Sequence, residues 1–194
     1  MESMLDLLRG RRSYRRFLQT PVAPAVTSEM IEAARIASSA ANRQVLKYVL
    51  VQSPAMVAQL HPLVRWAAYL PAAQGTPAAA EQPVLYVVVL QDESIPGAKA
   101  GDTDAGLALG SMTAVAWSHG VGSCILGAID RPAIAALLGL ADHLHIRCVL
   151  ACGFPAHKSK IVPVENGSIQ YYLDDARDYC VPKRPTEEIL VKTV

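Results

Sequence analysis

The stretch "VLYVVVL", residues 84–90, constrains the fold more than any other part of the chain. Its apolar residues follow one another without a polar break, which is typical of a strand covered on both faces. Residues 102–120, "DTDAGLALGSMTAVAWSHG", predict a long helix, because they begin with acidic residues and end at a glycine. Apolar side chains lie nearly all the way round this helix, so we expect it to be buried on several sides. The two segments together predict a central sheet wrapped by helices.

The remaining elements complete an α+β pattern. Further strands are predicted at residues 45–51, 145–154 and 168–173, with a strand or turn at 123–129. Helices are predicted up to Gly10, from a cap at Thr27 or Ser28 to about Ser38, from Pro54 to about Val64, from Pro132 to about Leu138, and as a closing turn at 185–190. Residues 71–83 and 91–101 are predicted to be connections. Because the crossovers are uneven, the pattern favours an α+β class over a regular Rossmann fold.

Size and charge exclude several classes of protein. With 194 residues the chain is expected to form one domain over residues 1–194. Eighteen basic and seventeen acidic side chains give a net charge of +1, which excludes a global field able to attract nucleic acid or an acidic membrane. No apolar run reaches the roughly 18 residues of a membrane span, and the first ten residues lack the apolar core of a signal peptide. The cysteines show no C-x-x-C spacing, so we expect reduced, buried thiols of a cytoplasmic protein and no metal site.

The clearest functional signal is a local concentration of positive charge. Five arginines lie between Arg9 and Arg16, in and beside "GRRSYRR". A solvated helix face, a nucleic-acid arm and an anion site each explain this cluster taken alone. Near the other end of the chain, "VPKRP" places Lys183 beside Arg184. Forked guanidinium donors, an ammonium group and the hydroxyl of Ser13 suit a compact dianion such as a phosphate monoester. The two basic segments together favour an anion site shared by both ends of the chain.

A third polar segment, "ARIASSAANRQ" at residues 34–44, offers side chains that can hydrogen-bond the edge of a polar ligand. In chain order, "RRSYRRF", "ASSAANRQ", "DAGLALGSMTAVAWSHGVGS", "ILGAID", "LACGFPA" and "VPKRPTEEIL" resemble the nitroreductase family of flavoproteins over essentially the whole chain. The resemblance implies an α+β sandwich with a central, mostly antiparallel sheet, and an intertwined homodimer with FMN at the subunit interface. It further implies that residues 161–194 form a C-terminal extension reaching the partner subunit.

The resemblance also implies which positions contact FMN. They come from five segments of the chain: Arg11, Arg12, Ser13 and Arg15; Ser38, Ser39 and Asn42, contributed by the partner subunit; Gln74; Leu126 and Gly127; and Lys183 and Arg184. Within this set, Arg15 corresponds to a basic residue near the pyrimidine edge of the flavin, and Gln74 to an amide that contacts the same ring. Leu126 and Gly127 match the backbone that passes flavin N5, and Lys183 with Arg184 completes the phosphate site.

The sequence departs from the family pattern in three places. One is the segment "VENGSIQYYLDDARDYC", which is longer than in minimal members of the family. The usual "PSSxNxQPW" stretch reads "SSAANRQVLKY" here, which keeps Asn42 and Gln44 but replaces the proline and tryptophan. Gly127 stands where some members of the family carry a glutamate. These changes place the chain in a different subgroup and leave the implied FMN site intact.

The predicted function is an FMN-dependent oxidoreductase that passes a hydride from NADH or NADPH to a nitroaromatic, quinone or similar small-molecule electron acceptor. A reduced flavin carries negative charge at N1 and the C2 carbonyl, so a fixed Arg15 there would raise its tendency to accept a hydride. Catalysis then needs positioning and electrostatics, and no catalytic side chain is predicted. Two alternatives use the same scaffold: a non-catalytic FMN-binding or storage protein, and a specialised reductive dehalogenase or desaturase.

Overall fold

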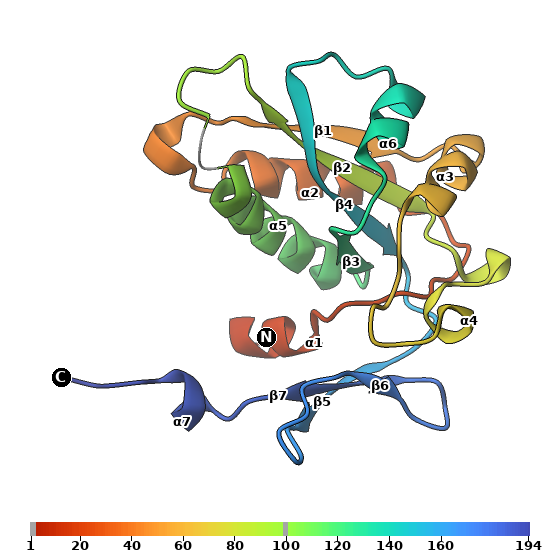
Figure 1. Ribbon diagram of the computed structural model, residues 1–194, viewed down its shortest axis with the longest axis vertical. Helices are drawn as coiled ribbons and strands as arrows, with labels where there is room; N and C mark the ends of the chain where they lie inside the picture. The colour runs from red at the N-terminus through yellow and green to blue at the C-terminus, as the bar shows by residue number, and fades with distance from the viewer. Residues whose placement is uncertain (1–2, 99–100) are drawn as a thin grey trace.

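The computed structural model describes residues 3–98 and 101–194 and centres on a four-stranded antiparallel sheet (Figure 1). The strand order is β1-β2-β4-β3, with bounds Leu46–Val51, Leu85–Asp92, Leu144–Gly153 and Gly122–Leu126 in that order. Every neighbouring pair in this sheet is antiparallel. The α+β class and the predicted central strand at 84–90 are therefore confirmed.

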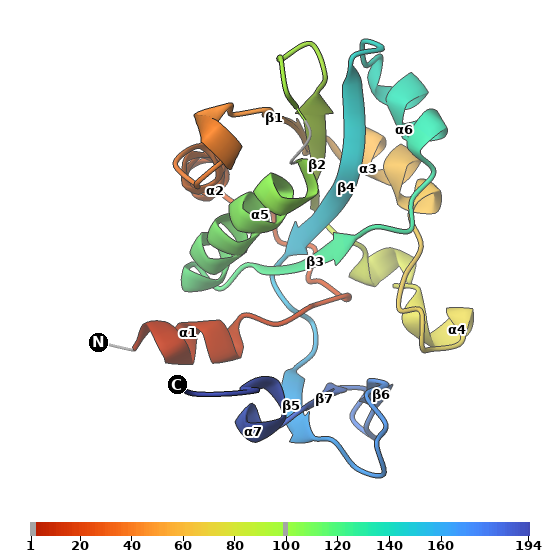
Figure 2. The same cartoon turned by 60° about the vertical axis from the view of Figure 1, so that its left-hand side comes forward.

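Strand β2 separates two hydrophobic cores. Tyr86, Val88 and Leu90 belong to one core, whereas Leu85, Val87 and Val89, which alternate with them, belong to the other. The first core lies beneath the helices α3 and α6, and the second beneath α2 and α5 (Figure 2). Their bounds are Pro54–Leu60, Arg131–Leu138, Pro24–Arg35 and Gly101–Ser118. The sheet is thus covered on both faces, as its continuous apolar run predicts.

Helix α5 differs from the sequence expectation in its burial. Ala105, Ala108 and Met112 face the core, but Leu107 on the other side of the helix is 46% exposed. The expectation of burial on several sides is therefore wrong for the single chain, because no element of the described chain covers this second apolar face.

Several element boundaries also differ from the prediction. Helix α3 ends at Leu60 and not near Val64, and a 3-10 turn follows at His61–Leu63. Helix α2 begins at Pro24 and not after Thr27 or Ser28, because a proline fits the first turn of a helix, where its missing N–H is not needed. It ends at Arg35, short of Ser38. Strand β2 continues to Asp92, since Gln91 and Asp92 pair with β4. The predicted 91–101 connection is accordingly shorter, and its residues 99–100 lie outside the described residues.

Residues 159–183 form a second, smaller sheet of order β5-β7-β6. Its strands are Ser159–Pro163, Tyr179–Lys183 and Tyr172–Leu173. The strand predicted at 168–173 shrinks to two residues, because only these pair with β7. Strands β5 and β7 lie in a stretch that alternates irregularly and were not predicted. We call residues 159–183 the C-terminal arm; the closing helical turn that follows it, α7 at Thr186–Ile189, matches the prediction.

Short elements join these layers. Helix α1 spans Met4–Gly10, α4 spans Ala72–Gly75, and 3-10 turns lie at Ala40–Asn42, His61–Leu63 and Ala79–Glu81. Residues 11–17 run between the main sheet and the C-terminal arm (Figures 1 and 2). All four cysteines are buried and unbridged, as expected. Among the described residues, no helix combines the length and the apolar character needed to cross a membrane.

Candidate anion-binding site

A cavity of about 300 Å³ lies where the N-terminal arginines meet the C-terminal arm. It is lined by Arg11, Arg12, Ser13, Arg15, Thr113, Ser123, Ile125, Tyr171, Val181 and Lys183. Most of the N-terminal arginine cluster and Lys183 from β7 therefore surround one space, although they stand at opposite ends of the sequence. Arg9 and Arg16 do not line the cavity.

The cavity carries positive charge that no acidic side chain among its lining residues neutralises. Arg11 Nη1 donates a hydrogen bond to Thr113 Oγ1 at 3.1 Å. Within the described residues, however, Arg11 Nε, Arg12 Nε and Arg15 Nη1 are buried without a hydrogen-bond partner. Burial, and to a lesser degree the charge of Arg11, lowers the pKa of Arg12. Buried, charged donors without an acceptor among the described residues are typical of an anion-binding site.

Arg15 is positioned through both its backbone and its side chain. Its backbone N–H donates to His157 Nε2 at 3.0 Å. Its guanidinium carbon lies 4.5 Å from the centre of the Tyr171 ring and 4.8 Å from that of Tyr179. Both tyrosines belong to the C-terminal arm, so this arm forms one wall of the cavity.

His157 joins the arginine segment to the C-terminal arm as a neutral ring. Its Nδ1–H donates to the carbonyl of Lys158 at 2.7 Å, which leaves Nε2 free to accept from Arg15. Burial is the main cause that lowers the pKa of His157 to about 4, and the charges of Arg16 and Arg15 lower it further. Protonation at Nε2 would remove the acceptor that Arg15 uses.

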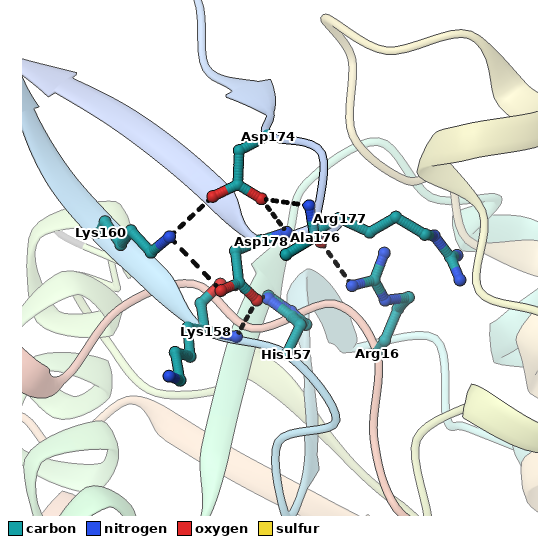
Figure 3. A network of polar contacts seen from close by, with 8 residues as sticks. All are labelled: Arg16, His157, Lys158, Lys160, Asp174, Ala176, Arg177 and Asp178. Atoms are coloured by element: carbon teal, nitrogen blue, oxygen red, sulfur yellow. Dashed lines mark hydrogen bonds and ion pairs between the residues drawn. The ribbon is translucent and has the colours of Figure 1, made fainter.

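A polar network fixes the turn at residues 174–178 of the arm (Figure 3). The backbone N–H of Lys158 donates to Asp178 Oδ1 at 2.7 Å, and Lys160 Nζ lies 2.7 Å from Asp174 Oδ2. Arg16 Nη2 donates to the carbonyl of Arg177 at 2.5 Å. The arm is therefore tied to the arginine segment through residues that do not line the cavity.

The other residues implied by the resemblance lie outside this cavity. Arg184 is half-exposed, and its Nη1 donates to Glu188 Oε2 at 2.8 Å. Gln74 is exposed on α4. Leu126 is buried in the hydrophobic core, and Gly127 follows it at the exposed end of β3.

Ser38 and Ser39 line a separate cavity of about 440 Å³ between α2, β1 and α5. The following loop turns sharply, with positive φ angles at Ala41, Asn42 and Gln44. Asn42 is exposed on this loop. The single chain therefore keeps this polar segment apart from the arginine cavity.

Five lining residues were missed by the sequence interpretation: Thr113, Ser123, Ile125, Tyr171 and Val181. Thr113 gave a weak signal, as a polar residue in the apolar second half of α5. Tyr171 gave none, because its place in the cavity depends on how the C-terminal arm folds back.

The chain is thus an α+β protein with a candidate anion site, a cavity lined by basic residues from both ends of the sequence. Residues 8–154 match the sequence model of the nitroreductase family. This match covers more than half of the chain, so the chain belongs to the nitroreductase family, and the resemblance noted in the sequence is confirmed.

Individual relatives and structures agree with this assignment. An FMN reductase [NAD(P)H] of Bacillus subtilis is 27% identical over 183 residues, covering 84% of this chain and 70% of that protein. An NADH dehydrogenase of Thermus thermophilus is 29% identical over 182 residues, covering 76% of this chain and 84% of that protein. A Desulfovibrio desulfuricans protein solved in complex with FMN has a TM-score of 0.70 at 23% identity, covering 100% of this chain and 98% of that one. At this identity the structural likeness establishes the fold.

The protonation of His157 predicts a pH dependence of stability. In the unfolded chain its pKa is near 6.5 and in the folded protein about 4, so below about pH 6.5 the unfolded state binds the proton first. The free energy of unfolding should therefore be highest above this pH and fall by about 3 kcal/mol as the pH drops towards 4. Urea unfolding between pH 4 and 7 measures this slope. His157→Gln, which keeps a hydrogen-bond acceptor, should flatten it; an identical slope in the variant would contradict the assignment.

Proposed function

We propose that this protein is an FMN-dependent oxidoreductase that transfers a hydride from NADH or NADPH to a small electrophile such as a nitroaromatic or a quinone. The observation that carries the proposal is the cavity of unpaired, buried arginine donors in a chain of the nitroreductase family. The names of the Bacillus subtilis and Thermus thermophilus relatives support a flavin and a nicotinamide nucleotide as the reaction partners. Four free, buried cysteines are in keeping with a reducing compartment such as the cytoplasm.

The residues of the arginine cavity fit the anionic end of FMN. Arg11, Arg12 and Lys183 offer charged donors and Ser13 a hydroxyl, and the orphaned Nε atoms of the two arginines have no competing acceptor among the described residues. Arg184, half-exposed beside Glu188, would add charge from outside the cavity. Together these groups would hold the phosphate.

The remaining groups are assigned to the flavin ring. When bound, FMN supplies the capacity to accept and donate a hydride. Arg15 would offer its charge to the pyrimidine edge, Gln74 an amide to the same ring, and the backbone at Leu126 and Gly127 would pass N5. In this assignment the chain binds, orients and stabilises charge, and none of its side chains forms a covalent bond with substrate.

We propose that the protein is a homodimer in which each chain completes the site of the other. The outer face of α5 leaves Leu107 exposed, and Ile36 at the end of α2 is 66% exposed. Helix α1, the outer face of α5 and the C-terminal end lie on one side of the molecule in both views (Figures 1 and 2). A second copy would cover these apolar surfaces. It would also bring its Ser38, Ser39 and Asn42 to an arginine cavity that they do not reach within their own chain.

The purified protein should bind FMN and be reduced by a nicotinamide nucleotide. After reconstitution with FMN under anaerobic conditions, NADH or NADPH should bleach the flavin absorbance, and a nitroaromatic or quinone should restore it. Absorbance spectra before and after each addition measure this. Protein that stays colourless after reconstitution would refute the proposal. Bound flavin that neither nucleotide bleaches would favour the non-catalytic FMN-binding protein instead.

The phosphate assignment predicts which basic residues matter for affinity. Arg12→Ala should weaken FMN binding about 10- to 100-fold, because a buried anion loses a charged partner worth about 1.5–3 kcal/mol. Arg9→Ala is the matched control, since Arg9 pairs with Asp6 on exposed α1 and does not line the cavity. Lys183→Ala should weaken binding more than Arg184→Ala, which loses a half-exposed charge. Titration by flavin fluorescence quenching compares the four variants; equal effects of Arg9→Ala and Arg12→Ala would contradict the assignment.

The dimer assignment predicts that FMN binding depends on association. Diluting the holoprotein until the dimer dissociates should release FMN. Flavin fluorescence measures the release, and sedimentation measures the mass of the protein. Asn42→Ala should weaken FMN binding without changing the mass. Asn166→Ala is the control, because Asn166 is also exposed and has a similar positive φ, but lies in the C-terminal arm. A flavin-loaded monomer would contradict the shared site.

A further inference from the structure

Arg15 is the arginine of the N-terminal segment whose guanidinium is positioned by aromatic rings. Arg9 pairs with Asp6 at 2.8 Å, and Arg16 lies 3.6 Å from Glu81. Within the described residues, Arg15 forms no ion pair, and its guanidinium rests over the rings of Tyr171 and Tyr179. Its Nη1 is buried without a hydrogen-bond partner in the described part of the chain, and its side chain lines the cavity.

A guanidinium can be held in place by an aromatic ring or by a carboxylate, and the two partners leave it with different net local charge. A carboxylate would cancel most of the positive charge seen by a nearby ligand. An aromatic ring attracts the cation through its quadrupole and carries no net charge. Arg15 is therefore restrained while its full charge remains available to the cavity.

The two rings are themselves fixed by the C-terminal arm. Tyr179 is fully buried on β7, and its ring centre lies 4.8 Å from that of His157. The Tyr171 hydroxyl accepts a hydrogen bond from the backbone N–H of Tyr69 at 3.4 Å, and the ring centres of Tyr69 and Tyr171 are 5.0 Å apart. The network of Figure 3 anchors the turn between Tyr171 and Tyr179 to Arg16. The support for Arg15 therefore comes from a rigid part of the arm.

We propose that Tyr171 and Tyr179 act as an uncharged clamp that orients Arg15 towards a bound flavin ring without neutralising it. The tyrosines are positioning residues, because they act through Arg15. This inference rests on the proposed function and deepens it by giving the C-terminal arm a part in setting the reduction potential of FMN. A fixed, uncompensated cation stabilises the anionic reduced ring more than the neutral oxidised ring, so the clamp raises the midpoint potential.

The test uses Tyr171, because Tyr179 is fully buried and its replacement endangers folding. Tyr171→Leu removes the ring, and Tyr171→Phe keeps the ring but loses the hydroxyl. Tyr172→Leu is the matched control, since this neighbouring tyrosine is 50% exposed and does not line the cavity. For each FMN-loaded variant, the midpoint potential and the dissociation constant of oxidised FMN are measured, together with the thermal unfolding midpoint.

Tyr171→Leu should weaken the binding of reduced FMN about tenfold more than that of oxidised FMN. For a two-electron couple, this lowers the midpoint potential by about 30 mV. Tyr171→Phe and Tyr172→Leu should keep the wild-type potential. An unchanged potential in Tyr171→Leu, or an equal loss in Tyr171→Phe, overturns the clamp while leaving the proposed function intact. Failure of the wild-type protein to bind FMN overturns the proposed function instead.

Discussion

The site depends on how Tyr14 fastens the arginine-rich segment to the body of the protein. Its backbone N–H donates to the carbonyl of Ser123 on β3 at 2.9 Å, and its hydroxyl donates to the carbonyl of Gly10 at 3.1 Å. Its ring stacks on Trp117 of α5, with the centres 5.0 Å apart. Successive side chains of an extended segment point to opposite sides, so a buried Tyr14 turns Ser13 and Arg15 towards the cavity. One apolar anchor thus sets the direction of the charged groups around it.

Elements that follow from local pattern could be predicted from the sequence. The apolar run at 84–90 specified a strand with two covered faces, because alternate residues must then pack on opposite cores. The meeting of the N-terminal arginines with Lys183 could be anticipated from charge, since two basic clusters in a nearly neutral chain suggest a common anion. The sequence could not show which of Lys183 and Arg184 lines the cavity. It depends on the register of β7, where Val181 and Lys183 line the cavity and Arg184 follows the strand.

The rest of the site depends on contacts that no local pattern records. Tyr171 comes just before a strand of only two residues, so periodicity gives no sign that its ring lies over Arg15. No sequence motif marks His157, yet its neutral ring joins two segments from opposite ends of the chain. For α5 the pattern described a helix that is apolar all round, but the single chain covers only one face. The sequence pattern indicated that both faces of α5 are apolar, but it did not indicate what covers the second face.

The cluster of arginines also makes folding and ligand binding depend on each other. Like charges held close together with buried, unsatisfied N–H groups raise the free energy of the folded state. Carboxylates would relieve this cost, but they would also occupy the donors and cancel the charge that an anion needs. The chain instead supports Arg15 on aromatic rings and leaves Arg11 Nε and Arg12 Nε without a hydrogen-bond partner among the described residues. An anion that binds only the folded state then stabilises it by mass action. The groups that lower the stability of the empty protein are therefore the ones through which a bound phosphate would restore it.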